Sequence, residues 1–387
     1  MPKSRQRSLR VPKPISRFEL AQVPHPTREA EMNAEKYWIG IDVGESSTSL
    51  CFLTTSNKIE HATAAGSGTR EIAKALARVD PKCIEAVALE SGAGHRLPRE
   101  LAALGFPVTT VDSFRAAKFL SIRSMKTDAN DARGLAEVAR YALETGISVH
   151  VKNVTCEQIR VQLALRHQLI GQRVAARGAL RSHLRTLGSD VKRMASPTKL
   201  RDQVEVEMER MRQAGLGDVV PEILSLLELA QALDAATYCL DLRLKMRAAA
   251  NPITEKFMLI PGVGPVTALS FFSAIENPHR FKRSADVGAY LGLVPRLRQS
   301  GSTSKSGRIT RAGNKMTRSH LYMSAGVLMS RALQQTQMGD WAKSLQERMR
   351  FNKARVALAR KLAVVMLTIW KTGSTFKCYP EAVQLSD

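Results

Sequence analysis

The sequence predicts an α/β domain over residues 36–150, an α-helical coiled-coil hairpin over residues 151–254 and a mainly α-helical domain over residues 255–387. In the first region short apolar runs alternate with helix-like segments, the pattern of an α/β layer fold. In the second, apolar residues recur at helical spacing without any strand pattern. A Pro-Gly turn and a long apolar helix mark the third region.

The elements of the α/β region follow from its apolar runs and turn residues. Two adjacent strands come first, joined by a short turn, and α/β crossings follow them. This order suits a ribonuclease-H-like sheet. Strands are expected at residues 37–43, 49–54, 84–89 and 107–111, and helices at residues 69–79, 98–104 and 128–143.

Four carboxylates stand at informative places in this region. Asp42 and Glu90 each end an apolar run, and Asp128 and Asp131 lie three apart at the start of a predicted helix, so they share one helix face. Two charges about 4 Å apart repel by about 4 kcal/mol at an effective dielectric of about 20. Mg²⁺ or Mn²⁺, which prefers oxygen ligands, would remove that penalty. If the four acids converge, the pattern is typical of two-metal phosphodiester chemistry.

The charge of the chain indicates a polyanionic partner. Lys and Arg number 58 against 35 Asp and Glu, which gives a net charge of +23 and a pI near 10.2. A generally basic soluble surface is the alternative, but the uneven placement of the charge favours nucleic acid. Residues 1–35 read as a disordered basic tail, which either contacts nucleic acid or is merely solvated.

Cysteine usage and hydropathy bear on the compartment. The five cysteines are scattered and odd in number, and none forms a CxxC pair, which argues against disulfides and zinc. No apolar run is expected to span a membrane, and the first residues contain no secretory signal. We therefore expect a cytoplasmic protein in a reducing compartment.

The helical region carries a row of arginines. Breaks at Ser196-Pro197 and at residues 215–221 divide it into antiparallel helices. The arginines at four-residue steps would repel one another on a free helix, and only Asp190 lies nearby in sequence, so we expect a phosphate-binding stripe. A solvated coiled-coil flank is the alternative. The stripe consists of Arg173, Arg177, Arg181 and Arg185.

The third region combines a tight turn, a basic loop and a core helix. Residues 259–267 match the turn of a helix-hairpin-helix element, in which Gly262 and Gly264 would present backbone N–H groups to a phosphate. A plain helix–helix turn is the alternative. Residues 354–370 read as a core helix. Residues 292–314 read as a flexible loop whose cations could bind nucleic acid, as could Lys315 just after the loop. The loop cations are Arg296, Arg298, Lys305, Arg308 and Arg311.

A serine in this loop could act as a nucleophile. A serine–DNA intermediate conserves the energy of the phosphodiester bond, so strands can be rejoined without another energy source. Ser300 is the best candidate, because the loop cations could hold the scissile phosphate. By loop chemistry alone Ser302, Ser304 and Ser306 compete with it.

The chain resembles the Piv/MooV-type DEDD insertion-sequence transposases (insertion sequence 110 family). The resemblance covers nearly everything after the tail and rests on IGIDVG, ALESG, KTDANDAR, IPGVG and the block GLVPRLRQSG…GRITRAGN. It implies metal binding by Asp42, Glu90, Asp128 and Asp131, with Ser300 as nucleophile. Many relatives have two serines before the glycine, whereas this chain has Gln299 at the first position.

The resemblance further implies a RuvC-like first domain, a coiled-coil insertion, a C-terminal transposase domain and a guide RNA that pairs with donor and target DNA. No DNA-reading module is recognisable in the sequence, which agrees with recognition by RNA. We also expect a homo-oligomer, a dimer or tetramer. Its active site could combine the acids of one protomer with Ser300 of another.

Three other functions compete with this one. A ribonuclease-H-fold nuclease or junction resolvase using water would need the acids but not Ser300. An actin-like or sugar-kinase ATPase would also have Asp-x-Gly on its first strand, but it requires a second phosphate loop and little positive charge. A basic binding protein with a degenerate site is disfavoured by the presence of all four acids.

Overall fold

The computed structural model describes residues 35–64, 66–93, 96–121, 125–145, 148–189, 197–300, 303–331 and 336–378. The chain forms two compact units, Met1–Asn153 and Val154–Asp387. The predicted basic tail lies outside the described residues, except for Glu35 at its end.

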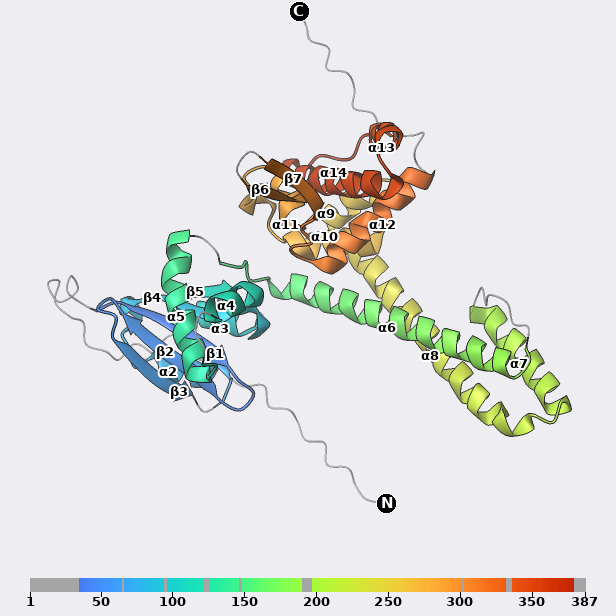
Figure 1. The fold of residues 1–387 in the computed structure, drawn as a ribbon, viewed down its shortest axis with the longest axis horizontal. Helices are drawn as coiled ribbons and strands as arrows, with labels where there is room; N and C mark the ends of the chain where they lie inside the picture. Colours follow the sequence, from blue (N-terminus) through green and yellow to red (C-terminus); the bar gives the residue numbers. More distant parts are fainter. Residues whose placement is uncertain are drawn as a thin grey trace, which may run out of the picture. The chain divides into compact units, whose positions relative to one another are not determined.

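The first unit is built on a five-stranded mixed sheet (Figure 1). The strand order is β3-β2-β1-β4-β5, with β1 antiparallel to β2, β2 antiparallel to β3, and parallel pairing of β1 with β4 and of β4 with β5. The central strands β1 and β4 therefore end at the same edge. The strands are β1 (Tyr37–Val43), β2 (Thr48–Thr54), β3 (Ile59–Ala64), β4 (Ile84–Glu90) and β5 (Val108–Val111).

Helices cover both faces of this sheet. Ile39 and Ile41 pack with Leu76 and Leu101 on one face, which is covered by α2 (Thr69–Leu76) and α3 (Arg96–Ala103). The other face packs against α4 (Ser113–Leu120) and α5 (Asp128–Thr145) through Ala88, Leu135 and neighbouring apolar residues. Two short 3₁₀ helices flank β4, at Pro81–Cys83 and Ser91–Ala93.

The expected strands and helices of this unit are confirmed, with ends displaced by a few residues at most. Two elements were missed. Strand β3 lies at the sheet edge and exposes half of its residues, so its apolar pattern is weak. Helix α4 begins at the cap Asp112, whose carboxylate accepts from the backbone N–H of Arg115, and it buries only Ala116.

The second unit begins with a long pair of helices, α6 (Val154–Thr186) and α8 (Val220–Ala249). Their contacts run antiparallel: Arg166 pairs with Asp241, whereas Arg177, further along α6, pairs with Asp234, earlier on α8. Between them in sequence come α7 (Pro197–Gln213) and a 3₁₀ turn, Gly217–Val219. Helix α7 packs on the end of the pair through a core that includes Leu184, Val204 and Leu227 (Figure 1).

One helical stretch is more apolar than the sequence analysis expected. The helical stretch Gly217–Ala249 is, by length and composition, apolar enough to cross a membrane, with a mean hydropathy of 1.3 in its most apolar window. One such helix is weak evidence for a membrane, and two of its acids form the ion pairs with α6.

The rest of the second unit is mainly helical. Its core joins Phe257, Phe271, Leu321 and Leu362, and residues 354–370 lie in a core helix as expected. The elements are α9 (Pro252–Met258), α10 (Pro265–Ile275), the 3₁₀ helix Pro278–Arg280, α11 (Asp286–Tyr290), β6 (Pro295–Ser300), β7 (Thr303–Ile309), α12 (Lys315–Arg331), α13 (Gln337–Arg348) and α14 (Phe351–Thr372).

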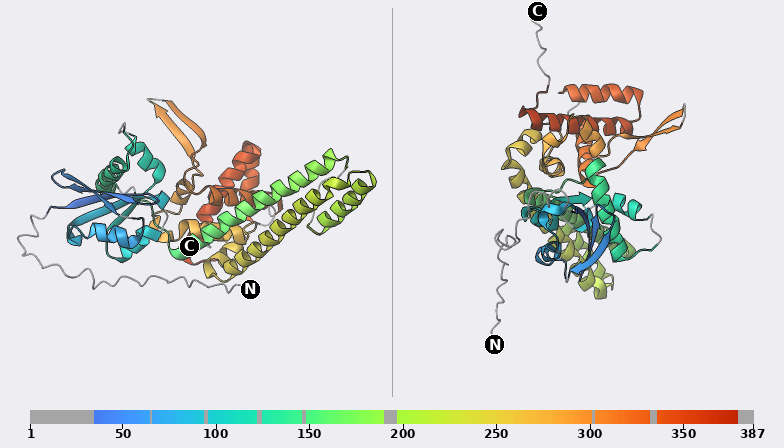
Figure 2. Two further views of the ribbon diagram at one scale, coloured as in Figure 1. Left: turned by 90° about the horizontal axis from the view of Figure 1, so that it is seen from below. Right: turned by 90° about the vertical axis from the view of Figure 1, so that its left-hand side faces the viewer.

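The basic segment between α11 and α12 was expected to be a flexible loop, and this was wrong. It forms an antiparallel ribbon of β6 and β7 that projects from the helices of its unit (Figure 2). The side chains of the ribbon are largely exposed, so no apolar alternation marks it in the sequence. Backbone pairing, from Pro295 with Ile309 to Ser300 with Thr303, holds the ribbon together.

Candidate active site and nucleic-acid surface

Asp42 and Glu90 lie side by side at the carboxyl edge of the sheet. Strands β1 and β4 run parallel, and Ile41 pairs with Leu89, so each acid is the residue after that pair. Side chains two residues apart in a strand share a face. Asp42 therefore shares the face of Gly40, and Glu90 shares the face of Ala88, which packs against α5.

Gly40 brings α5 onto this face. A Cβ atom at Gly40 would lie 2.0 Å from the carbonyl oxygen of Ala132 and 2.3 Å from the backbone nitrogen of Ala136. Only a glycine permits so close an approach of helix to strand. Asp128 and Asp131 precede this contact by about one turn and lie on the same helix face. The close contact thus places them on the side of the sheet that carries Asp42.

The start of α5 is fixed by local hydrogen bonds. The backbone N–H of Asn130 donates to Thr127 Oγ1 at 3.2 Å, and Asn130 Nδ2 donates to the carbonyl of Met125 at 3.0 Å. The Thr127 hydroxyl therefore caps the helix, which begins at Asp128. The positive end of the helix dipole favours both carboxylates in its first turn.

The electrostatics of Asp42 reflect this grouping. Burial raises the pKa of its carboxyl above the ordinary value, and the charges of Asp131, Asp128 and Glu90 raise the pKa further, while Lys126 opposes them. Within the described residues, no three acidic, His or Cys side chains are yet close enough to ligate one ion. The donor set is carboxylate oxygen throughout, which fits a hard divalent cation such as Mg²⁺ or Mn²⁺ once the side chains close together.

Ser300 lies in the second unit, at the end of β6. It is exposed and pairs with Thr303 across the ribbon, while Arg298 pairs with Lys305. Its rivals differ in place: Ser304 pairs with Gln299 and Ser306 with Leu297, further down the ribbon, and Ser302 lies outside the described residues. The exposed position leaves the hydroxyl of Ser300 accessible to a phosphate.

The two glycines of the predicted phosphate-binding turn have different surroundings. Gly262 has a positive φ of 83°, and a Cβ there would lie 2.8 Å from the carbonyl oxygen of Ser324 on α12. Gly262 therefore serves close packing. Gly264 is exposed, has open space around it, and precedes α10 without a side-chain cap. Phosphate binding at this turn remains a prediction, to which Gly264 is better placed to contribute.

The premise of the arginine stripe was wrong in part. Asp234 on α8, only 8% exposed, pairs with Arg177 and lies 3.7 Å from Arg173. Sequence reasoning considered only Asp190, because the partner is far away in the chain and meets the stripe through the antiparallel register. Arg185 is exposed and Arg181 half-buried. For these two arginines, phosphate binding stays a prediction.

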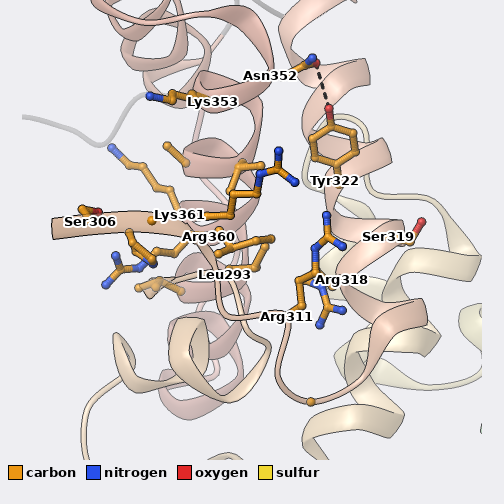
Figure 3. Close-up of a pocket in the computed structure, with 18 of the residues that line it drawn as sticks. Leu293, Ser306, Arg311, Arg318, Ser319, Tyr322, Asn352, Lys353, Arg360 and Lys361 are labelled. Carbon is orange, nitrogen blue, oxygen red and sulfur yellow. Dashed lines mark hydrogen bonds between the residues drawn. The ribbon is translucent and has the colours of Figure 1, made fainter. Parts of the chain in front are cut away.

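The second unit contains a cationic cavity, and the sequence analysis identified only some of the cations that line it. Arg308, Arg311 and Lys315, for which nucleic-acid contacts stay a prediction, line it together with further cations from the helices α12 and α14 (Figure 3). The signal was available, because positions seven and eight apart share a helix face. It was overlooked because α14 was treated only as a core helix. The additional cations are Arg318, Lys353, Arg360 and Lys361.

Comparison with known proteins connects both regions to one family. Residues 39–188 match the DEDD transposase model of the IS110 group, described as "Transposase", and residues 254–339 match "Transposase IS116/IS110/IS902 family". The first match contains all four acids, and the second contains Ser300 and the two glycines of the turn. Both compact units are therefore represented.

Individual relatives are similar over most of their length. The chain is 28% identical to the "Transposase for insertion sequence element IS1111A" of Coxiella burnetii over 350 residues, 88% of this chain and 91% of the relative. It is 26% identical to the "Probable family 20 transposase" of Pseudomonas aeruginosa (77% and 86%) and 27% identical to the "Transposase for insertion sequence element IS1328" of Yersinia enterocolitica (76% and 86%). The matches on both units agree, and the chain belongs to the IS110 family of DEDD insertion-sequence transposases.

Proposed function

We propose that this transposase cleaves and exchanges DNA strands with its first unit acting as a RuvC-like, ribonuclease-H-like metal-dependent domain. One observation carries the proposal: Asp42, Glu90, Asp128 and Asp131 belong to one face of the sheet, and the charges of the other three raise the pKa of Asp42. The strand order β3-β2-β1-β4-β5, with a carboxylate at the end of each central strand, supports the same assignment.

The chemistry divides between the two units. A divalent pair held by the four acids would supply Lewis-acid stabilisation to the attacking and leaving oxygens. Ser300 would give up its hydroxyl proton and form a new phosphorus–oxygen bond, while the bond from phosphorus to the leaving DNA oxygen breaks and that oxygen takes up a proton. Arg296 and Arg298 lie on the same strand, four and two residues before it, and would hold the phosphate charge.

The partners follow from the charge and the family. Donor and target DNA are the substrates, and a guide RNA that pairs with both would supply sequence recognition. The protein would act as a homo-oligomer in the bacterial cytoplasm, associated with the nucleoid. Because the acids and Ser300 belong to different compact units, a site composed of two protomers is compatible with the fold.

The test is covalent capture. Purified protein with labelled element-end DNA, guide RNA and Mg²⁺ should yield a protein–DNA adduct that maps to Ser300. Ser300→Ala should abolish the adduct, whereas the matched control Ser225→Ala, which alters an exposed serine on α8, should retain it. An adduct that persists in Ser300→Ala would overturn the assignment of the nucleophile. Cleavage without any adduct would favour a nuclease that uses water.

A mixing experiment tests the composite site. Asp42→Asn and Ser300→Ala proteins should each be inactive, and a mixture that forms mixed oligomers should recover part of the cleavage. Adduct should then form only on the chain that retains Ser300. If mixed oligomers form and the mixture stays inactive, the site is built within one chain.

A further inference from the structure

One feature that this mechanism does not use is the cavity between the ribbon, α12, α13 and α14. Its volume is about 1780 Å³, and Ser306, Tyr322, Trp341 and Asn352 come from the four elements that enclose it (Figure 3). Small-molecule sites usually have volumes of about 300–1,000 Å³. The cavity is therefore suited to a length of polymer rather than to one small ligand.

The charge of the cavity is of one sign. Seven of its lining residues are Lys or Arg, and none is Asp or Glu. Within the described chain none of the seven forms a salt bridge, and burial together with the charge of Arg311 lowers the pKa of Arg318. Such a concentration of unpaired positive charge in a concave site attracts a polyanion.

Aromatic and apolar surface accompanies this charge. The guanidinium of Arg355 covers one face of the Tyr322 ring at 3.9 Å from its centroid, and Tyr322 also borders the cavity. The Tyr322 hydroxyl donates to Asn352 Oδ1 at 3.1 Å, which fixes the ring (Figure 3). Val356 and Leu293 add apolar lining. A ring held in this way, with Arg355 over one face, is a platform on which an unpaired base can stack.

The cavity adjoins the part of the ribbon that leads to Ser300. Ser306 lines it and pairs with Leu297, three residues before Ser300 on β6. At about 3.3 Å per residue, that separation is about 10 Å along the strand. A strand whose phosphate lies at Ser300 could therefore continue into the cavity within a few nucleotides.

We propose that the cavity binds an unpaired stretch of nucleic acid next to the scissile phosphate, with the backbone on its cations and a base stacked on Tyr322. The position of the cavity next to the scissile phosphate rests on the proposed role of Ser300. The binding of nucleic acid in the cavity does not depend on that role. A duplex keeps its bases stacked on one another, so it would not use the aromatic platform. The occupant is therefore single-stranded, either DNA or RNA.

The experiment measures binding by the full-length protein without divalent metal. The probes are single-stranded DNA, single-stranded RNA and duplex DNA of one sequence, each carrying 2-aminopurine, whose fluorescence falls on stacking. Tyr322→Leu should weaken single-strand binding about tenfold and abolish the quenching, and it should change duplex binding little. Tyr322→Phe should retain both, and Tyr238→Leu, which alters an exposed tyrosine on α8, is the matched control.

A charge variant tests the proposal even if Tyr322→Leu does not fold. Lys353→Gln with Arg308→Gln alters two exposed side chains and should reduce the slope of log affinity against log salt for single strands by about 1.4. Comparison of the DNA and RNA probes identifies the occupant. Unchanged single-strand binding in Tyr322→Leu and in the charge variant would overturn the proposal. Because no cleavage is measured, the binding site can stand even if Ser300 is not the nucleophile.

Discussion

The carboxylate site of the first unit and the cationic cavity of the second each gather side chains of one charge, negative in the first and positive in the second. In the first, the close contact at Gly40 gathers acids whose charges raise the pKa of Asp42. In the second, burial and Arg311 lower the pKa of Arg318. Each region holds like charges together against their repulsion, and each therefore calls for a partner of opposite charge. A divalent cation suits the first region and a nucleic-acid strand suits the second.

The helical pair supplies the contrast. There Arg177 meets the nearly buried Asp234 across the helices, so the charges compensate each other within the protein. Unpaired charge thus marks the surfaces that we assign to partners, and paired charge marks structure. Variants in each of these regions test this distinction between paired and unpaired charge.

The largest effect is expected at the acids. Asp42→Asn or Asp128→Asn should lower DNA cleavage by about a thousandfold or more, because the metal ligands are lost. Nucleic-acid binding should remain within about twofold, since it depends on Lys and Arg. Glu60→Gln changes an exposed carboxylate of the same sheet and is the control. Efficient cleavage by Asp42→Asn in EDTA would disprove the metal assignment.

The next effect concerns position rather than charge. Gly40→Ala retains all four carboxylates but forces α5, which carries Asp128 and Asp131, away from β1, so cleavage should fall about a hundredfold. The affinity for Mn²⁺ should fall as well. A variant that was only less stable would contain less folded protein, but its folded molecules would bind Mn²⁺ with normal affinity. Gly171→Ala, on α6 with open space around it, should leave both unchanged. Normal Mn²⁺ affinity in Gly40→Ala would show that Gly40 does not position the acids of the site.

The arginine stripe should divide into two halves. Arg177→Gln leaves Asp234 buried without its closest partner and should lower the free energy of unfolding by about 3 kcal/mol in urea titrations. Adding Asp234→Leu should recover much of that loss. Arg181→Gln with Arg185→Gln should change stability by less than about 0.5 kcal/mol per site yet flatten the salt dependence of DNA binding. An unchanged salt slope would return this surface to a solvated flank.

The smallest effect is expected at His320, a half-buried residue of α12 near Arg166 and His167 of α6. Burial lowers the pKa of His320 to about 4 from its ordinary 6.5, with help from both neighbours. The neutral form is thus favoured in the folded state, so its stabilisation is complete above pH 6.5 and declines as the pH falls towards 4. Urea unfolding should show wild type losing about 1–2 kcal/mol more than His320→Gln between pH 7 and 5. Equal losses would contradict this.

The sequence was most informative where one pattern repeats locally. Apolar runs located the strands that end in Asp42 and Glu90, and helical spacing placed Asp128 and Asp131 on one face. That these faces coincide depends on the absent side chain of Gly40, which becomes meaningful only once helix and strand are packed.

Features set by distant partners could not be predicted in this way. Asp234 lies 57 residues from Arg177, and their meeting depends on the register of α6 against α8. The β6–β7 ribbon has exposed polar side chains, so the strand pattern is absent from its sequence and only the backbone pairing reveals it. The cations of α14 were hidden by the apolar face that the same helix turns to the core.

We assign the four grouped acids to the binding of a divalent cation. Mn²⁺ binding to the full-length protein, followed by electron paramagnetic resonance without any nucleic acid, tests it directly. Wild type should show saturable binding, and a concentration of a hundred times Kd should raise the stability by about 2.7 kcal/mol. Asp42→Asn should lose both responses, while Glu60→Gln should keep them. Equal Mn²⁺ binding by wild type and Asp42→Asn would contradict this assignment.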